Sequence, residues 1–406
     1  MPCRDSGLAE VIIKFGGELK VSSHQRRTLE AIRRCRTAEL GGHIDACDNC
    51  GHLKISYNSC RNRHCPRCQG LNKEAWIIQQ EDQLLPVAYF HVVFTLPHEL
   101  NSLCMYEPRR MYDLLFKAAW HTLKTLSHDP KWLGAKPAAT MILHTWGQNL
   151  SMHPHVHSIV PNGGLTSEGN WQFPKRGKVN FLYPVKGMQK LYKGYFMQKL
   201  KDLLAEPDWH FPPDFPIDKV FKEWKDELYK KDWVVYTKKP WSAPRFGGVK
   251  SVVEYLGRYS HKVAISNGRI LKIDDRSVTF SYKDYRQNSP QKQTMTLKGD
   301  EFLRRLCQHI LPLGFRKVRS FGFIANASKR KSIKTARKAL HVKQKELLDK
   351  AERRELAKQR IFKKETDQCP CCKKGKMVTI EVLSVARAPP TAMNSQTQLK
   401  RLLQEF

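Results

Sequence analysis

Two short segments of this 406-residue chain carry side chains that together could cut a nucleic acid strand. Residues 153–157 read HPHVH, so on a strand the three imidazoles would point to one face. Tyr255 and Tyr259 stand at i and i+4 in the stretch SVVEYLGRY, so on a helix both phenols would face the same way. A metal-binding histidine pair beside helical tyrosines is what a nuclease needs if it forms a covalent phosphotyrosine.

A third imidazole could complete the metal site. His144 ends an apolar, strand-like segment, TMILHT, and residues 146–152 are enough to turn the chain into an antiparallel hairpin. That hairpin would let His144 approach His155 and His157, giving a three-histidine site with positions open for a substrate oxygen. The alternative is that these histidines only stack or contact phosphate on an exposed strand.

The segment with the two tyrosines could simply present an apolar core face. Its surroundings favour a chemical role, because three groups that can carry positive charge, Arg258, His261 and Lys262, stand close to the phenols in sequence. Such charge favours phenolate over phenol and attracts a phosphate. Lys262 follows Tyr259 by about one helical turn, so a nucleophile and a cation would share one face.

Two CxxC knuckles occur near the N-terminus, one formed by Cys47 and Cys50 and the other by Cys65 and Cys68. Each knuckle places two thiolates within reach of one tetrahedral ion, and the loop between them would bring the two pairs together. The sequence therefore predicts one structural zinc site with these four cysteines as ligands.

The loop between the knuckles has further polar groups. Cys60 and His64 could replace a ligand or hold a second ion, or could be a buried thiol and a capping or base-contacting imidazole. Arg61, Arg63 and Arg67 make the loop basic, so we expect these three side chains to contact DNA.

Composition also indicates a polyanionic partner. The chain has 71 Lys and Arg against 38 Asp and Glu, a formal net charge of +33. No apolar run approaches the roughly 20 residues of a membrane helix, and the N-terminus does not read as a signal peptide. We expect a cytoplasmic, nucleoid-associated bacterial protein, whose clustered thiols bind metal rather than form disulfides.

Three blocks differ in composition: 1–80 with the cysteine knuckles, 81–327 with intermixed strands and helices, and 328–406, a basic arm. Strands are expected at 88–96, 140–145, 155–160, 234–237, 270–273 and 277–282, and helices at 23–38, 108–127, 186–205, 249–260 and 300–310. This mixture predicts an α+β or α/β core. The arm predicts a long solvated helix or a disordered segment, which contacts either solvent or DNA phosphates. Its Cys369, Cys371 and Cys372 resemble half of a zinc site.

Four segments occur in an order typical of one family: VVFTLP (92–97), HPHVHSIVPNGGL (153–165), EYLGRYSHKVAISN (254–267) and RSFGFIANA (319–327). In these segments the chain resembles rolling-circle transposases of the two-tyrosine, His-hydrophobic-His type, and more narrowly the insertion-sequence-ninety-one group. The RNRHCPRCQ knuckle resembles that group's zinc-binding domain. The resemblance spans residues 25–330.

The resemblance implies an α+β fold: an antiparallel sheet flanked by helices, with the paired histidines on a central strand and the tyrosine helix against it. A small N-terminal zinc-binding domain and a basic helical C-terminal arm would complete the chain. His155 and His157 match the family's metal-binding pair, and Tyr255 and Tyr259 match its nucleophiles. The third ligand stays open between His144, Gln148 and His153.

We therefore expect a transposase that cuts and rejoins single DNA strands through a 5′-phosphotyrosine, with structural Zn and catalytic Mg or Mn. Strand separation would need a host helicase. Trp146, Trp171 and Trp241 could stack bases or lie in the core. Two other classes remain: a metal-dependent hydrolytic nuclease without a covalent intermediate, and a zinc-finger DNA-binding regulator without chemistry.

Overall fold

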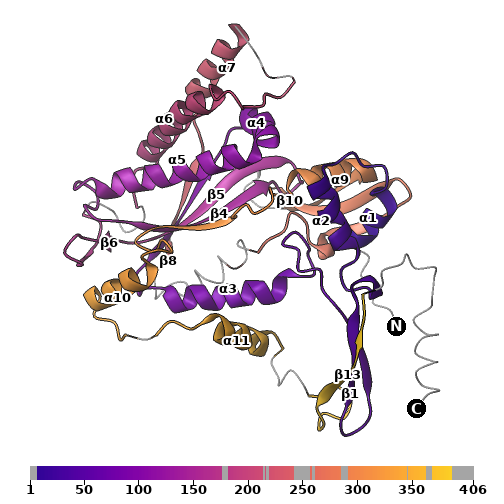
Figure 1. Ribbon diagram of the computed structural model, residues 1–406. Helices are drawn as coiled ribbons and strands as arrows, with labels where there is room; N and C mark the ends of the chain where they lie inside the picture. The colour runs from indigo at the N-terminus through magenta and orange to yellow at the C-terminus, as the bar shows by residue number, and fades with distance from the viewer. Residues whose placement is uncertain are drawn as a thin grey trace.

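A five-stranded antiparallel sheet lies at the centre of the chain (Figure 1), with strand order β12-β4-β5-β3-β8. The structure is a computed structural model that describes residues 7–175, 182–213, 215, 219–241, 257, 261–284, 291–344, 346–362 and 368–385. The sheet strands are β3 (Tyr89–Thr95), β4 (Ala138–Trp146), β5 (Met152–Pro161), β8 (Val235–Trp241) and β12 (Val318–Gly322). The expected α+β class with an antiparallel, helix-flanked sheet is confirmed.

One face of the sheet is apolar and carries helices. Side chains alternate across a strand, so Phe90, Val92 and Phe94 of β3 point to this face together with Leu143 and Val156 of the neighbouring strands. In Figure 1 the long α5 crosses above the sheet, with α6 and α7 beyond it. The helices on this side are α4 (Asn101–Tyr106), α5 (Pro108–His128), α6 (Val185–Leu204) and α7 (Lys219–Lys230).

The opposite face is apolar at one end and rich in histidine at the other. Ile142 and Ile159 pack in a smaller core that also includes Ala336 of α10. Further along the same strands, His144, His155 and His157 replace the apolar residues. In Figure 1 this side faces α3 (Gln69–Gln83), α10 (Lys329–Ala339) and α11 (Lys350–Phe362).

A second sheet, of order β11-β10-β9, shares a core with the N-terminal helices. Phe280 of β10 and Phe302 of α9 pack with Val11 and Ile32, and Leu150 of the β4–β5 loop enters the same core. The N-terminal helices are therefore packed on residues of the central block. These elements are α1 (Leu8–Phe15), α2 (Ser23–Arg33), β9 (Ile270–Ile273), β10 (Ser277–Asp284), β11 (Gln291–Lys298) and α9 (Gly299–Gln308).

The C-terminal strand returns to the N-terminal part of the chain. A third sheet has the order β13-β1-β2, with β1 (Gly42–Cys47) between β2 (Leu53–Tyr57) and β13 (Met377–Leu383). Figure 1 shows β13 (yellow) running along β1 (indigo). Short elements complete the description: η1 (Ala38–Leu40), η2 (His98–Leu100), β6 (Gly164–Leu165), β7 (Trp171–Gln172) and η3 (Asn267–Arg269).

The basic arm differs from its expected form, a single solvated helix or a disordered segment. Two separate helices, α10 and α11, pack on the rest of the protein, because Ile333 and Ala336 give α10 a narrow apolar side that its many charges obscure in the sequence. α11 lies along α3. Arg360 of α11 bonds Glu81 at 2.7 Å and Glu74 at 3.3 Å.

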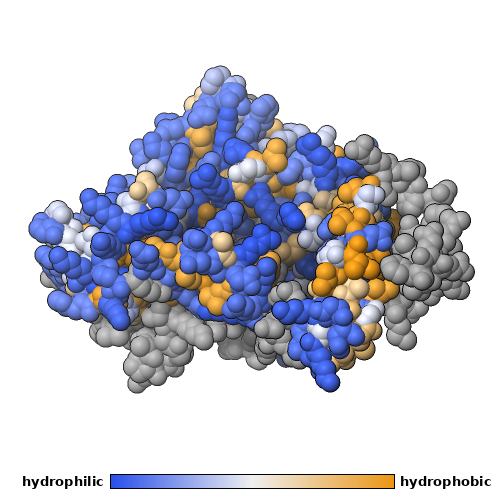
Figure 2. Space-filling model, turned by 60° about the horizontal axis from the view of Figure 1, so that its bottom comes forward, coloured by the Kyte–Doolittle hydropathy of each residue, from blue (hydrophilic) through white to orange (hydrophobic). Residues whose placement is uncertain are grey.

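The other expected strands and helices are confirmed within a few residues, except the helix at 249–260. Apart from Gly257, that segment lies outside the described residues. No helix among the described residues combines the length and the apolar character that a membrane crossing requires. Figure 2, in which the underside of Figure 1 comes forward, shows a face that is mostly hydrophilic.

A substitution at Gly322, where β12 ends beside β4, should test how closely β12 packs at the edge of the central sheet. Gly322 has a φ of 71°, and a Cβ there would collide with the carbonyl of Pro137. Gly322→Ala should therefore destabilise the protein by more than about 1 kcal/mol in urea unfolding. Gly194→Ala is the control: it lies inside α6 with open space around it, so it should stabilise by about 0.5–1 kcal/mol. Equal stability of the two variants would contradict this description of the edge.

Candidate functional site

The β4–β5 hairpin brings the expected histidines together. His144 of β4 lies directly opposite His155 of β5, and the two strands turn through a loop closed by the Gly147 N–H bonded to Ser151 O at 2.8 Å. Leu150 in that loop has a φ of 63°. The expectation of an antiparallel hairpin at 146–152 is confirmed.

His144, His155 and His157 form a compact group. One ring nitrogen of each lies within 4.8 Å of those of the other two. The ring centroids of His144 and His157 are 4.7 Å apart, and those of His155 and His157 are 4.8 Å apart. Three imidazoles in this arrangement could hold one divalent ion and leave coordination positions for a substrate.

A backbone contact sets the tautomer of His155. Its Nδ1 lies 2.6 Å from the carbonyl oxygen of His153. A carbonyl can only accept, so Nδ1 carries the proton and Nε2 keeps its lone pair for a ligand bond. This is the arrangement that metal-binding histidines commonly adopt.

His91, which the sequence reasoning missed, supports His157 from the next strand. Its Nε2 lies 2.9 Å from His157 Nδ1, and the two rings are stacked at 5.1 Å with an interplanar angle of 11°. The contact would orient His157 so that its Nε2 is available for an ion. The available signal was a single imidazole inside the largely apolar run AYFHVVFTL.

Burial keeps the central imidazoles neutral at pH 7. Burial, together with the nearby His153 and Lys262, lowers the pKa of His155 to about 4, although its hydrogen bond to the His153 carbonyl acts in the opposite direction. Burial likewise lowers the pKa of His157 well below its ordinary value, with additional repulsion from the neighbouring histidines. Neutral rings are the form that can donate a lone pair to a metal.

A cavity of about 660 Å³ opens over these histidines. Lys262 lines it, and burial lowers the pKa of that ammonium, with Arg269 and Lys283 contributing. Gln148 and His153, the alternatives for a third ligand, also line it, although neither belongs to the three-nitrogen group. The other lining residues are Trp146, Gly147, Asn149, Ser151, Tyr282, Lys283, Asp284 and Met295.

The hairpin loop is fixed by residues at the ends of η3 and α9, beside the second sheet. Arg269 donates to the carbonyl of Gln148 and, at 2.7 Å, to that of Ser281. His309 Nε2 lies 3.1 Å from Leu150 O, while its Nδ1 lies 3.2 Å from Thr145 Oγ1. These contacts hold both ends of the loop, so the histidine strands have a rigid support.

Tyr255, Arg258 and Tyr259 lie outside the described residues. The described residues around them connect α3 with the cavity. Gly257 is packed against Ile77 of α3, where a Cβ would collide with the isoleucine side chain. Further along, the His261 ring lies 6.1 Å from that of Trp76 in the same helix.

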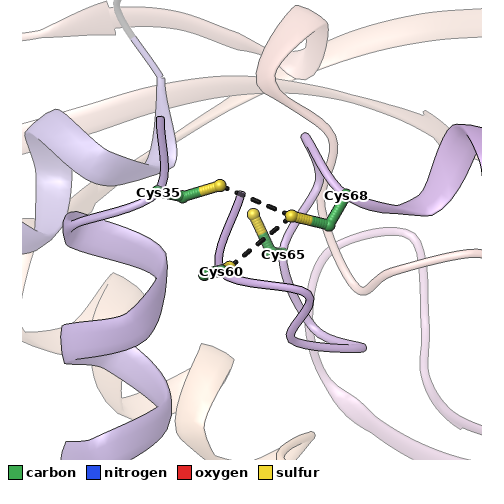
Figure 3. Close-up of side chains that lie close together, drawn as sticks. All are labelled: Cys35, Cys60, Cys65 and Cys68. Atoms are coloured by element: carbon green, nitrogen blue, oxygen red, sulfur yellow. Dashed lines mark hydrogen bonds between the residues drawn. The ribbon is translucent and has the colours of Figure 1, made fainter. Parts of the chain in front are cut away.

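The cysteines form two clusters where the sequence predicted one site. Figure 3 shows Cys35, Cys60, Cys65 and Cys68 pointing toward one another, with Cys68 Sγ 3.4 Å from Cys35 Sγ and 3.6 Å from Cys60 Sγ. A tetrahedral zinc with Zn–S bonds of about 2.3 Å would separate its sulfurs by roughly 3.8 Å. The donor type and spacing therefore fit zinc.

Cys47 and Cys50 do not join Cys65 and Cys68 and instead lie with Cys369 and Cys372. The expected grouping of both knuckles around one ion is thus wrong. Cys47 ends β1, and β1 pairs with β13. The partner cysteines of Cys47 and Cys50 therefore come from the far end of the chain. Cys35 and Cys60 complete the first cluster without a CxxC spacing of their own.

The three arginines expected at DNA differ in their contacts. Arg63 donates to the carbonyls of Phe315 and, at 3.0 Å, Pro312, so it braces a loop. Arg61 and Arg67 line a groove of about 790 Å³. Lys350, Arg353 and Arg354 of α11 line the same groove. The N-terminal loop and the C-terminal arm together make one basic groove.

Two protein-family models match this chain. Residues 138–332 match the family described as "Putative transposase", and residues 9–96 match the "Transposase zinc-binding domain". Over 401 residues the chain is 39% identical to "Putative transposase y4qJ" of Sinorhizobium fredii (strain NBRC 101917 / NGR234), with 94% of this chain and 97% of that protein covered.

A second relative is "Transposase for insertion sequence element IS801" of Pseudomonas savastanoi pv. phaseolicola. It is 32% identical over 309 residues, which cover 74% of this chain and 70% of that protein. Among solved structures, a conjugative relaxase TrwC in complex with oriT DNA matches 43% of this chain and 74% of its own, at 12% identity and a TM-score of 0.25. Another TrwC complex, with a 27-mer DNA, covers 44% and 68% at 14% identity and a TM-score of 0.23.

Removing the imidazole of His91 should weaken metal binding at the histidine group. His91→Ala takes away the partner of His157 Nδ1, so affinity for Mn²⁺ should fall roughly 10- to 100-fold in calorimetric titration. His91→Gln, whose amide can still accept that hydrogen bond, should recover part of the loss. His98→Ala, at an exposed imidazole in η2, is the control. An unchanged affinity in His91→Ala would refute the supporting role.

Proposed function

Because this chain belongs to the insertion-sequence-ninety-one group of transposases, we propose that it cuts and rejoins single DNA strands through a 5′-phosphotyrosine intermediate. The observation that carries the proposal is the group of His144, His155 and His157 at the base of a cavity lined by Lys262. Lys262 follows the Tyr255–Tyr259 segment, which would supply the nucleophiles.

The donor set decides which ion suits the site. Imidazole nitrogens favour borderline transition metals, whereas Mg²⁺ prefers an all-oxygen shell. Of the two ions expected from the sequence, Mn²⁺ therefore fits His144, His155 and His157 better than Mg²⁺. When bound, such an ion would polarise the scissile phosphate and offset the charge that develops on it.

The tyrosines would perform the covalent step. The phenol of Tyr255 or Tyr259 gives up its proton, its oxygen bonds to phosphorus, and the bond from phosphorus to the 3′ oxygen breaks. The DNA then carries a 5′-phosphotyrosine on one side and a 3′-hydroxyl on the other. The cation of Lys262 would favour the phenolate and attract the phosphate.

Conservation of the phosphodiester energy makes rejoining independent of ATP. Attack by a 3′-hydroxyl on the phosphotyrosine restores a DNA phosphodiester and releases the phenol. A second tyrosine would allow another cleavage while the first end is still covalently held. This gives a physical reason for a pair of nucleophiles in a rolling-circle mechanism.

The basic groove offers a path for the DNA strand. Arg61 and Arg67 of the N-terminal loop line it together with Arg353 and Arg354 of α11, and so does Trp76. Guanidinium groups neutralise phosphates, and an indole can stack on an unpaired base. His261 lines the groove too, and it follows the tyrosine segment directly. We therefore assign single-stranded DNA to this groove. Strand separation by a host helicase stays an expectation from the family resemblance.

A hydrolytic nuclease is the second candidate, because a three-histidine cavity could also activate water. The two functions differ in their need for the tyrosines. Tyr255→Phe combined with Tyr259→Phe should abolish the covalent protein–DNA adduct and lower strand cleavage by roughly four orders of magnitude. The assay uses an end-labelled single strand from the element's terminus and a denaturing protein gel.

Controls separate chemistry from folding in that assay. Tyr236→Phe, at an exposed phenol of β8, should leave the adduct unchanged. His155→Ala with His157→Ala should abolish cleavage while DNA binding persists. Cleavage that survives the double tyrosine change at the wild-type rate would establish the hydrolase instead. DNA binding with no cleavage by the wild-type protein would favour a regulator.

The groove should govern the salt dependence of DNA binding. Arg353→Ala with Arg354→Ala removes two cations from its wall, so the slope of log K against log salt should flatten by about 0.7 per lost phosphate contact. Lys190→Ala with Lys201→Ala removes the same charge from the exposed side of α6, where the slope should not change. Equal slopes for the two variants would exclude the groove as the DNA path. Point changes are preferred to deleting the arm, since deletion would also remove β13.

A further inference from the structure

We propose that Cys47, Cys50, Cys369 and Cys372 bind a second zinc ion, which fastens the C-terminal segment to the N-terminal part of the chain. The four sulfurs lie within 4.8 Å of one another. Cys47 Sγ is 3.7 Å from Cys372 Sγ, and Cys50 Sγ is 3.7 Å from Cys369 Sγ.

The distances between the sulfur atoms distinguish a zinc thiolate site from a disulfide. A disulfide needs sulfurs about 2.05 Å apart, whereas a tetrahedral zinc thiolate site places them roughly 3.8 Å apart. The 3.7 Å distances match the second case. Four soft sulfur donors also favour zinc over Mg²⁺ or Ca²⁺.

The two halves of the cluster adopt the same backbone turn although they come from opposite ends of the chain. The Gly51 N–H donates to Cys47 O at 3.0 Å, and the Lys373 N–H donates to Cys369 O at 3.1 Å. Gly51 and Lys373 both have a positive φ, of 65° and 57°. A left-handed residue directly after each CxxC pair directs both thiols toward one centre.

Backbone amides point at the sulfurs of both halves. The N–H groups of Asn49 and Cys50 donate to Cys47 Sγ at 3.4 Å each. In the other half, Cys371 N–H donates to Cys369 Sγ and Gly375 N–H to Cys372 Sγ, again at 3.4 Å. Such donors stabilise thiolate over thiol, the form that binds a metal.

Residues beside the cysteines also pack the two halves of the cluster closely against each other. A Cβ on Gly375 would lie 2.6 Å from Cys47 Sγ, so only glycine allows this approach. The Lys376 N–H donates to Asp48 Oδ1 at 2.8 Å. From there the chain enters β13, in which Met377 is the register partner of Cys47. The β1–β13 hydrogen bonds and the cysteine cluster are therefore satisfied by the same strand register.

The site has a consequence for the basic groove. Between Cys50 and Cys369 the chain passes through the whole transposase core, so a shared ion closes a very long loop. α11, just before Cys369, lies on α3 through Arg360 and presents Arg353 and Arg354 to the groove. A zinc at this cluster would hold α11 against α3 from its C-terminal end.

Zinc content of the purified full-length chain tests the proposal without DNA. In a His155→Ala, His157→Ala background, which removes the histidine group as a third place for zinc, the protein should carry two equivalents by atomic absorption, one for each cysteine cluster. Cys372→Ser and Cys65→Ser should each retain one, and the double variant none. Cys371→Ser is the matched control: its exposed thiol belongs to neither cluster, so it should keep both. Cys372→His should also keep both, because imidazole can replace one thiolate at zinc.

Full zinc content in Cys372→Ser, or an equal loss in Cys371→Ser, would overturn the second site. If the serine variant does not fold, cobalt titration of the wild-type chain decides. Two equivalents of tetrahedral, thiolate-bound Co²⁺ support the proposal, and one equivalent refutes it. None of these readouts depends on strand cleavage, so failure here and failure of the transposase chemistry are distinguishable.

Discussion

The antiparallel pairing of β4 with β5 is the constraint on which the rest of the structure depends. It places His144 opposite His155. His157, two residues further along β5, therefore points to the same face of the sheet. Side chains alternate along a strand, so a slip of one residue would send these imidazoles into the apolar core under α5 and α6. The Arg269 and His309 contacts to the hairpin loop oppose such a slip.

A strongly positive chain must still keep a metal-binding group uncharged. The protein does this mainly through burial, which lowers the pKa of His155 to about 4 and that of His157 well below its ordinary value. Several arginines of the N-terminal loop and α11 instead line the groove, where phosphates can neutralise them. The histidine cavity and the cationic groove are lined by neighbouring residues of the chain, Lys262 and His261 respectively.

The N-terminal and C-terminal parts of the chain are packed against each other. β13 adds a strand to the sheet of β1, and α11 packs on α3, which in turn packs on Gly257. The basic arm is therefore connected through α3 to Gly257, which stands between the two expected nucleophiles in the sequence. Compositional boundaries near residues 80 and 328 do not correspond to separate packing units in the described structure.

The sequence by itself determined what local geometry controls. Period-2 histidines and a connection long enough to turn the chain predicted the hairpin, and CxxC spacing marked Cys47, Cys50, Cys65 and Cys68 as members of thiol clusters. Only the tertiary structure decided which distant partners meet: Cys369 with Cys50, Cys35 with Cys68, and His91 with His157. Backbone periodicity fixes the face on which a side chain lies. The choice of neighbour depends on strand order and packing, and no local spacing encodes these.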